Sequence, residues 1–292
     1  MIGLKRGTVR LVPHEKVWED EAKRTISQLH RILGADAGKI EHIGSTAILS
    51  ICAKPIIDIA VEANSFEKIL THEEELRNVG FYYRPGVSIR NQLLFAAGSY
   101  YDGTGDEQTH FIHVVHTDSM DWINYINFRN FLNKDNSKAK EYEALKLSLA
   151  AKLPDDPGRK KYLAGKQEFI SETLRLALVD SFLGKNVDVI IDRPIGYVKE
   201  KDGFKTVYPV NYGYIPGVFA QDGEELDVYL FGVSEPVDSY KARIIGYVRR
   251  FDDNEDKLIA APDGVYLTEA EAENALDFQE RFFRHKIEIC FH

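Results

Sequence analysis

Three carboxylates stand in a fixed frame in the run DGEELD of this 292-residue sequence. They are Asp222, Glu224 and Asp227. Gly223 permits a bend after the first acid, so a loop of this kind can direct two carboxylates at one cation and leave the third to handle a proton. The alternative is an acidic turn that only faces water, which is the commoner role of such a run.

A second acidic cluster follows in the run RFDDNEDK. It contains Asp252, Asp253, Glu255 and Asp256, with Lys257 directly after them. Clustered carboxylates repel one another, so their pKa values rise unless a cation favours the ionised form. Hard divalent cations take oxygen ligands, and Mg²⁺ is the usual choice when phosphate is the other ligand. Two clusters in one region therefore favour a Mg²⁺ site.

The N-terminal half suggests a different chemistry. Gly44 and Ser45 follow one strand-like run, and Asp58 lies on the next. A turn of small residues can bring backbone N–H groups against a nucleotide phosphate, and an aspartate on the adjacent strand can hold the Mg²⁺ that bridges to it. Lys54 is a candidate for neutralising a phosphate, and an ordinary surface lysine is the alternative.

The elements that must position these residues fall into two blocks, residues 1–178 and 179–292. The first block has a helical pattern at 17–33 that Gly34 ends, strand-like runs KIEHIGS, PIIDIAVE, QLLFAAG and HFIHVVH, and a further helical pattern at 66–79. Residues 120–178 are typical of three helices broken at LNKDNS and LPDDPG. We expect an α+β domain with a helical tail.

The second block has short runs rich in β-branched residues, turn dipeptides such as Asp222-Gly223, and one amphipathic helical pattern at 268–284. This pattern predicts a small, mainly β barrel with one packed helix.

Composition limits the possible partners and compartments. The formal net charge of −9 falls entirely in residues 179–292, because acids and bases balance before them, and such a domain repels nucleic acid. The N-terminal region contains no apolar run of signal or membrane-spanning length, so we expect a cytoplasmic protein without a membrane partner. Cys52 and Cys290 each lie in an apolar run and are expected to be buried thiols. The oligomeric state stays open.

The C-terminal motifs occur in the order YPVNYGYIP, DGEELDVY and EDKLIAAP, and this order resembles the soluble inorganic pyrophosphatases over residues 187–292. The resemblance implies an OB-like barrel with Mg²⁺ as cofactor and pyrophosphate as substrate. Its implied metal ligands are Asp192, Asp222, Asp227, Asp252 and Asp256. Glu224 takes the position of the acid that activates the attacking water.

The same resemblance implies a set of phosphate-binding side chains. Tyr212 and Lys257 would hold phosphate oxygens, and Tyr208 would line the same wall. The segment between Asp192 and Tyr208 is too short for the long hairpin that carries the family's phosphate-gripping cations. The candidates to replace them are Arg193, Lys199 and Lys205. Near the C-terminus, Lys286 resembles the lysine of the family's final Tyr-Lys pair.

The N-terminal block resembles the GrpB family, whose fold belongs with the polymerase-beta-like nucleotidyltransferases. The runs LVPHEKVW, EHIGSTA, KPIIDI, HFIHVV and FRNFL carry this resemblance over residues 8–178. It implies a nucleotide site with Asp58 as metal ligand and with substrate contacts from Gly44, Ser45, Lys54 and His113. Ala60 stands where the superfamily has a second acid, so transferase activity stays open.

These observations together predict Mg²⁺-dependent hydrolysis of pyrophosphate by the C-terminal domain. Two alternatives remain, a regulatory nucleotide- or phosphate-binding protein with degenerate sites, and a hydrolase of another small phosphoanhydride.

Overall fold

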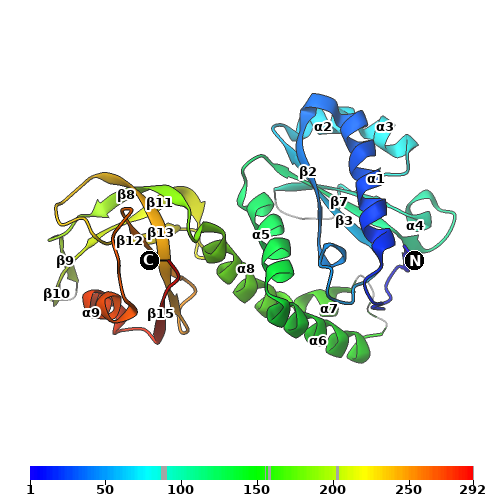
Figure 1. Cartoon of the computed structure of the whole chain (residues 1–292). Helices are drawn as coiled ribbons and strands as arrows, with labels where there is room; N and C mark the ends of the chain where they lie inside the picture. Colours follow the sequence, from blue (N-terminus) through cyan, green and yellow to red (C-terminus); the bar gives the residue numbers. More distant parts are fainter. Residues whose placement is uncertain (87–90, 155, 157–158, 202–203, 292) are drawn as a thin grey trace. The chain divides into compact units, whose positions relative to one another are not determined.

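The computed structural model of the chain describes residues 1–86, 91–154, 156, 159–201 and 204–291 (Figure 1). It contains two compact units, Met1–Leu174 and Arg175–His292, which we call unit 1 and unit 2. The division lies inside helix α8 (Gln167–Phe182), which therefore contributes residues to both units.

Unit 1 is built on a five-stranded sheet with the strand order β2-β3-β7-β5-β4. The strands are β2 (Ala37–Ile43), β3 (Ile57–Ala63), β7 (His110–His116), β5 (Gln92–Ala97) and β4 (Tyr82–Tyr83). Strands β3 and β7 are parallel, and the other neighbours are antiparallel. A small ribbon of β1 (Leu4–Lys5) and β6 (Glu107–Gln108) and the short helix α4 (Ser99–Asp102) complete this part.

Helices α1 (Lys16–Leu33), α2 (Phe66–Thr71) and α3 (Glu73–Asn78) cover one face of this sheet (Figure 1). In α1 the buried positions Trp18, Ala22, Leu29 and Leu33 recur at helical spacing, which confirms the predicted helix. Gly34 ends it with a φ of 52°, a conformation that glycine adopts without strain.

The alternation of side chains along β3 sends Asp58 to the other face of the sheet. Ile57, Ile59 and Val61 pack in the core with α1, so Asp58 and Ala60 face the opposite side. Helix α5 (Met120–Lys134) covers that side, where its Trp122 packs against Ala60.

The helical tail of unit 1 contains α5, α6 (Asn136–Lys152), α7 (Lys160–Ala164) and the start of α8. Three helices were expected here, and a fourth arises because the chain breaks again at Gly165 between α7 and α8. This tail lines a cavity that also contains Asp58 of β3.

Unit 2 contains a five-stranded barrel, as the sequence predicts. Strands β14 (Lys257–Ala261), β12 (Glu225–Leu230), β11 (Asn211–Phe219), β8 (Asn186–Arg193) and β13 (Ser239–Arg250) pair in that order, and β13 pairs back to β14. Strand β15 (His285–Ile289) adds to β13, and a hairpin of β9 (Val198–Lys201) and β10 (Phe204–Val207) lies between β8 and β11 in the chain.

Helix α9 (Glu269–Glu280) packs on the barrel core through Ala272 and Leu276. Thr268 and Glu271 form a capping box at its start, which satisfies backbone donors that the first turn leaves free. In the barrel, the backbone of β11 also approaches that of β8 very closely at Gly213. A Cβ at Gly213 on β11 would lie 1.8 Å from the carbonyl oxygen of Ile190 on β8.

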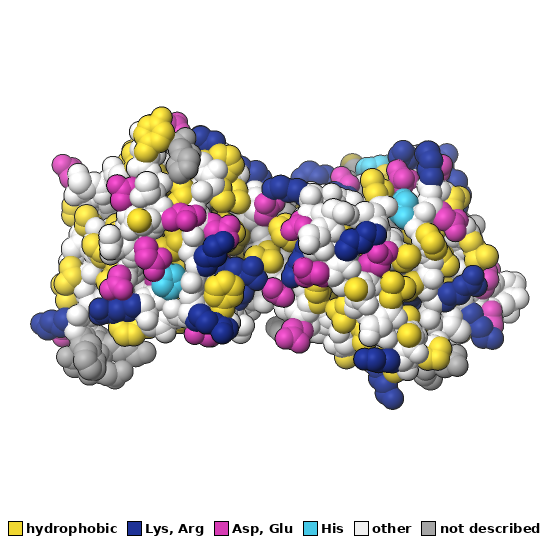
Figure 2. All heavy atoms as spheres, turned by 60° about the horizontal axis from the view of Figure 1, so that its bottom comes forward, with side chains coloured by type: hydrophobic (Ala, Val, Ile, Leu, Met, Phe, Trp, Pro, Cys, Tyr) yellow, Lys and Arg dark blue, Asp and Glu magenta, His cyan; other side chains and the backbone are white. Residues whose placement is uncertain are grey.

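The surface carries charges of both signs and one exposed thiol. On the face shown in Figure 2, acidic and basic side chains are interspersed rather than gathered in one broad patch of either sign. Cys290 is exposed and Cys52 only partly buried, so the expectation of two buried thiols is wrong. Within the described residues, no helix combines the length and the apolar character that a membrane crossing requires.

Candidate active site

Lys257, at the start of β14, lies at the centre of a group of polar side chains from three neighbouring strands. Its buried ammonium donates to the Tyr212 hydroxyl on β11, 2.8 Å away, and forms ion pairs with Asp227 on β12 and with Glu255, the latter at 3.0 Å. The Tyr212 hydroxyl also donates to Asp227. We call Tyr212, Asp227, Glu255 and Lys257 the Lys257 cluster.

Arg193 extends the cluster with a second cation. Its guanidinium lies over the ring of Tyr212, 4.9 Å from the centroid, and donates to the Tyr208 hydroxyl at 3.1 Å. Tyr208 is itself buried against Tyr212. Asp192, next to Arg193 on β8, is partly exposed and lies 3.7 Å from the Arg193 Nε. The structure thus brings together five residues that the sequence singled out and whose contacts form one continuous group, with Asp192 at its margin.

Glu255 is the residue that the sequence reading missed. Burial and a hydrogen bond with Asp227 raise the pKa of Glu255 to about 8. Burial opposes ionisation of Asp227, but its contacts with Glu255 and Lys257 outweigh burial and lower its pKa. Two adjacent carboxylates of this kind have too little positive charge around them. The run RFDDNEDK holds no signal that prefers Glu255 to Asp256, because both acids precede β14 and Asp256 finds its partner, Arg175, on α8.

The donor chemistry of these acids fits a hard divalent cation. Burial raises the pKa of Asp192, and repulsion from Asp227 adds to the rise, whereas the neighbouring Arg193 opposes it. The ammonium of Lys257 stands in the position of a cation between Asp227 and Glu255. Nevertheless, in the part of the chain that the structure describes, no group of three or more His, Cys, Asp or Glu side chains is already arranged around a metal position.

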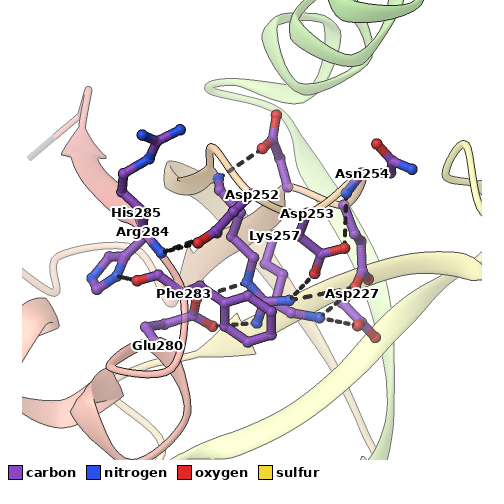
Figure 3. A network of polar contacts seen from close by, with 12 residues as sticks. Asp227, Asp252, Asp253, Asn254, Lys257, Glu280, Phe283, Arg284 and His285 are labelled. Carbon is purple, nitrogen blue, oxygen red and sulfur yellow. Dashed lines mark hydrogen bonds and ion pairs between the residues drawn. The ribbon is translucent and has the colours of Figure 1, made fainter.

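The two other acids expected in this cluster have different partners. Asp256 is buried and pairs with Arg175 of α8 at 3.2 Å, and it accepts the backbone N–H of Arg250 at 3.0 Å. Asp252 accepts the backbone N–H of Arg284 through both carboxylate oxygens at 3.0 Å (Figure 3). Both carboxylates hold the backbone of unit 2 in place, and we replace them by Glu255 in the proposed ligand set.

A buried arginine, Arg250, connects this backbone-holding network to the Lys257 cluster. Arg250 is 2% exposed and pairs with Glu280 at 2.7 Å and with Asp253 at 2.9 Å. Its Nη1 lies 3.8 Å from Glu255, and its guanidinium lies over the ring of Phe283. Every buried charge in this network therefore has an opposite charge beside it, which is the condition under which such charges are tolerated.

Four predicted residues lie outside the cluster. Asp222 and Glu224 are exposed in the turn between β11 and β12, where the Asp222 carboxylate accepts the Glu224 backbone N–H at 3.0 Å. Lys205 pairs with Glu200 at 2.7 Å, and Lys286 pairs with Glu288 at 2.9 Å, both on exposed strand surfaces. Their roles stay predictions.

In unit 1 one cavity of about 700 Å³ collects all five residues predicted for the nucleotide site. They are Gly44, Ser45, Lys54, Asp58 and His113. The Asp58 carboxylate lies so close to the Gly44 turn that a Cβ there would be 2.5 Å from its Oδ2. Asp58 also lies 3.9 Å from the His113 Nε2 on the parallel strand β7.

His113 is held in this cavity by a second contact. Its Nδ1 lies 3.3 Å from the hydroxyl of Tyr125 on α5, which donates to Gln92 at 3.0 Å. Burial raises the pKa of Tyr125 to about 12, so its proton stays available for hydrogen bonding at neutral pH. The residue two positions beyond Asp58 is the buried Ala60. Asp58 therefore has no second carboxylate at this position of β3.

The helical tail adds cations to the cavity wall that the sequence reading did not identify. They are Lys146 of α6, Arg159 and Lys166. A signal existed for the first of them. Lys146 follows Ala139 and Tyr142 at helical spacing on the buried face of α6, where a lysine is unexpected.

Comparison with known proteins agrees with this division. Residues 8–176 match the family model described as GrpB protein, and residues 184–291 match the model described as inorganic pyrophosphatase. A glutamate-rich protein GrpB of Alkalihalophilus pseudofirmus is 37% identical over 60% of this chain and 98% of its own length. A crystal structure of GrpB from Enterococcus faecalis, 28% identical, aligns with a TM-score of 0.53 over 59% of this chain and 99% of that chain.

The C-terminal match is shorter. An inorganic pyrophosphatase of Saccharolobus solfataricus is 35% identical over 26% of this chain, and the match spans 55% of that protein's length. The chain therefore belongs to the GrpB family through its N-terminal unit and carries, at residues 184–291, a domain that matches the inorganic pyrophosphatase family model.

Proposed function

We propose that unit 2 hydrolyses inorganic pyrophosphate, or a closely related small phosphoanhydride, with Mg²⁺ as cofactor. The observation that carries the proposal is the Lys257 cluster, in which acidic side chains and phosphate-binding side chains converge in a domain matching the pyrophosphatase family. In the reaction a water oxygen forms a bond to one phosphorus, the bridging P–O bond breaks, and the second phosphate leaves with the bridging oxygen.

The acids of this site would hold the cation. Asp227 and Glu255 are adjacent, Asp192 lies at the margin of the cluster beside Arg193, and Asp222 is retained as a further ligand from the β11–β12 turn. A divalent cation at this position neutralises charge on the substrate and makes water a better nucleophile at neutral pH. Glu224, in the same turn, is the proposed base, because its position is that of the acid assigned this role by the family resemblance.

The remaining side chains would bind the phosphates. Lys257 and Arg193 supply charge-assisted hydrogen bonds, and the Tyr212 and Tyr208 hydroxyls lie beside them. Positive charge at this position matters because the leaving phosphate accumulates negative charge as the bond breaks. Arg193 here takes the place of cations that a longer hairpin would carry, and Lys205 on β10 is the second candidate from the short hairpin.

The decisive experiment is phosphate release from pyrophosphate by the intact chain with Mg²⁺, beside Asp227→Asn and the exposed control Asp263→Asn. We expect release by the intact chain and by the control, and a loss on the order of 100-fold or more in Asp227→Asn. Chelation with EDTA should abolish release, and added Mg²⁺ should restore it. Absence of release at any Mg²⁺ concentration would leave a phosphate-binding domain and direct the search to other phosphoanhydrides.

We also propose that the cavity of unit 1 binds a nucleotide with Mg²⁺ through Asp58. The observation in favour is that the Gly44–Ser45 turn, Asp58 and His113 line the same cavity of about 700 Å³, a size typical of small-molecule sites. Asp58→Asn should weaken binding of a Mg²⁺–nucleotide by roughly ten-fold or more, while Asp20→Asn on the outer face of α1 should not. Titration calorimetry measures both.

A further inference from the structure

Four cations surround the helical side of the cavity in unit 1. They are Lys54, Lys146, Arg159 and Lys166. Lys146 is 1% exposed, Arg159 6% and Lys166 8%, whereas Lys54 is partly buried. Cations are almost never buried to this degree without a partner, so their surroundings need an account.

Their contacts are with aromatic rings and backbone carbonyls. The ammonium groups of Lys54 and Lys166 lie 5.0 and 4.8 Å from the centre of the Tyr162 ring. Lys146 lies over the Tyr142 ring and donates to the carbonyl of Cys52 at 2.6 Å.

Arg159 is also satisfied by neutral groups. It donates to the carbonyls of Thr8 and Lys5 at 2.9 and 3.2 Å. The buried carboxylate of Asp156 is close in the chain but accepts the backbone N–H of Tyr162 instead. As far as the described residues go, none of the four cations forms an ion pair with a carboxylate.

Their mutual repulsion is a cost that the folded protein carries. Burial and then the charges of Lys166 and Arg159 lower the pKa of Lys54 to about 7, and burial and Lys166 likewise lower that of Lys146 to about 7. Like charges gathered in a low-dielectric cavity are retained where they serve a ligand of opposite sign. Asp58 favours the charged form of Lys54 and Glu143 that of Lys146, but burial and the neighbouring cations outweigh both and lower the pKa of each lysine.

We infer that Lys54, Lys146, Arg159 and Lys166 form the binding subsite for an oligophosphate group carrying at least two negative charges. The tyrosine rings between the ammonium groups hold the cations apart, so closely spaced anionic oxygens of one ligand can reach several of them. This inference rests on the proposed ligand-binding role of the cavity, but it needs neither the metal nor the base of a nucleotide. It assigns the phosphates to these four cations, which line the same cavity as the acids Asp58 and Asp121.

The test is titration calorimetry of the intact chain with inorganic tripolyphosphate in EDTA. The chain carries Lys257→Gln and Arg193→Gln, which remove the phosphate-binding cations of unit 2. We expect one binding event per chain, weakened roughly ten- to 100-fold by Lys166→Gln or by Lys54→Met. Lys161→Gln, an exposed lysine of α7 beside the same wall, is the matched control and should bind within about two-fold of the parent.

Folding of the variants is checked through the fluorescence of Trp18 and Trp122, both of which lie in unit 1. No tripolyphosphate binding by the parent, or equal losses in Lys166→Gln and Lys161→Gln, would overturn the inference. A nucleoside triphosphate in EDTA should show the same sensitivity to Lys166→Gln, and adenosine alone should bind weakly. Asp58→Asn should leave tripolyphosphate binding intact, so loss of Mg²⁺–nucleotide binding with retained tripolyphosphate binding separates this inference from the nucleotide proposal.

Discussion

At the scale of single residues, Glu255 and Asp256 are neighbours in the chain whose carboxylates serve opposite purposes. Glu255 lies against Asp227 and Lys257, whereas Asp256 is buried against Arg175. A cation or a substrate can replace the partners of Glu255. The pairing of Asp256 with Arg175 instead compensates a charge that cannot reach water.

This difference predicts a clean separation of activity and stability. Glu255→Gln should reduce Mg²⁺-dependent phosphate release by on the order of 100-fold with little change in thermal stability, because the glutamine resembles the protonated acid. Asp256→Asn should cost about 3 kcal/mol of stability by leaving Arg175 without its partner, with specific activity preserved in the folded fraction. Urea unfolding and a phosphate-release assay on both variants check this. Equal effects of the two substitutions on activity would contradict the assignment.

A pH dependence follows from the cavity cations of unit 1. The pKa of Lys54 is lowered from its usual 10.5 to about 7, and that of Lys146 is lowered in the same way. Between pH 7 and 10.5 the unfolded chain therefore binds more protons than the folded chain, so the contribution of these groups makes unit 1 more stable as pH rises through this window. Below pH 7 their destabilisation is present in full.

Unfolding in urea at pH 7 and pH 9, monitored by tryptophan fluorescence, measures this rise. Lys54→Met should flatten the pH dependence and raise stability at pH 7 by about 1 kcal/mol, because a buried charge is replaced by an apolar side chain of similar shape. A Lys161→Gln chain should keep the slope of the parent. Unchanged stability of Lys54→Met at pH 7 would count against a repulsive cation group.

Some residues of the two candidate sites could be identified from the sequence, whereas the choice between Glu255 and Asp256 could not. The motif YPVNYGYIP singled out Tyr212, whose hydroxyl lies against Lys257 and Asp227, and the run PIIDI singled out Asp58, which lines the cavity of unit 1. The choice between Glu255 and Asp256 depends on Arg175, which is distant in sequence, and nothing in RFDDNEDK indicates which acid that arginine will neutralise. Competition between distant charges for one acid is a tertiary effect.

At the scale of elements, the pairing of β11 with β8 fixes the position of the Lys257 cluster. Gly213 follows Tyr212 on β11, and its backbone lies against Ile190 so closely that no side chain fits. The cluster is therefore positioned by a contact that only glycine permits.

Substitution at this glycine should be far more costly than at the nearby turn. Gly213→Ala is expected to cost several kcal/mol, because a Cβ would lie 1.8 Å from a backbone carbonyl that cannot move without breaking the β8–β11 pairing. Gly223→Ala has open space and should cost only about 1 kcal/mol for its positive φ. Thermal denaturation of the two variants compares them, and a similar loss in both would show that the barrel adapts.

The elements of the helical tail were predicted as helices, but their role as a cavity wall was not. Amphipathic patterning identifies which face of a helix is buried, and it gives no sign of what that face encloses. Lys146 illustrates this limit, since its ammonium donates to the Cys52 carbonyl, a contact that the pattern of α6 alone does not reveal.

At the scale of the whole molecule, the boundary between the family matches and the boundary between the compact units differ. The GrpB match ends at residue 176 and the pyrophosphatase match begins at residue 184, whereas unit 2 begins at Arg175. Within unit 2 the Arg175 guanidinium pairs with Asp256 and donates to the carbonyls of Arg250 and Asp253.

A fragment of residues 184–292 should therefore be less stable than a fragment of residues 167–292 by about 3 kcal/mol, because the shorter one buries Asp256 without its cation. Asp256→Asn in the short fragment should recover part of this loss. Urea unfolding followed by circular dichroism measures both, and identical midpoints for the two fragments would exclude a role for Arg175.

The position of Arg175 also decides where such a chain can be divided. Residue 175 lies inside the GrpB match, yet its side chain pairs with a buried carboxylate of unit 2. A chimaera joined at residue 184 would therefore import Asp256 without its cation, whereas one joined before α8 would carry the pair as a whole. The start of α8, and not the start of the pyrophosphatase match, is the point at which C-terminal domains should be exchanged.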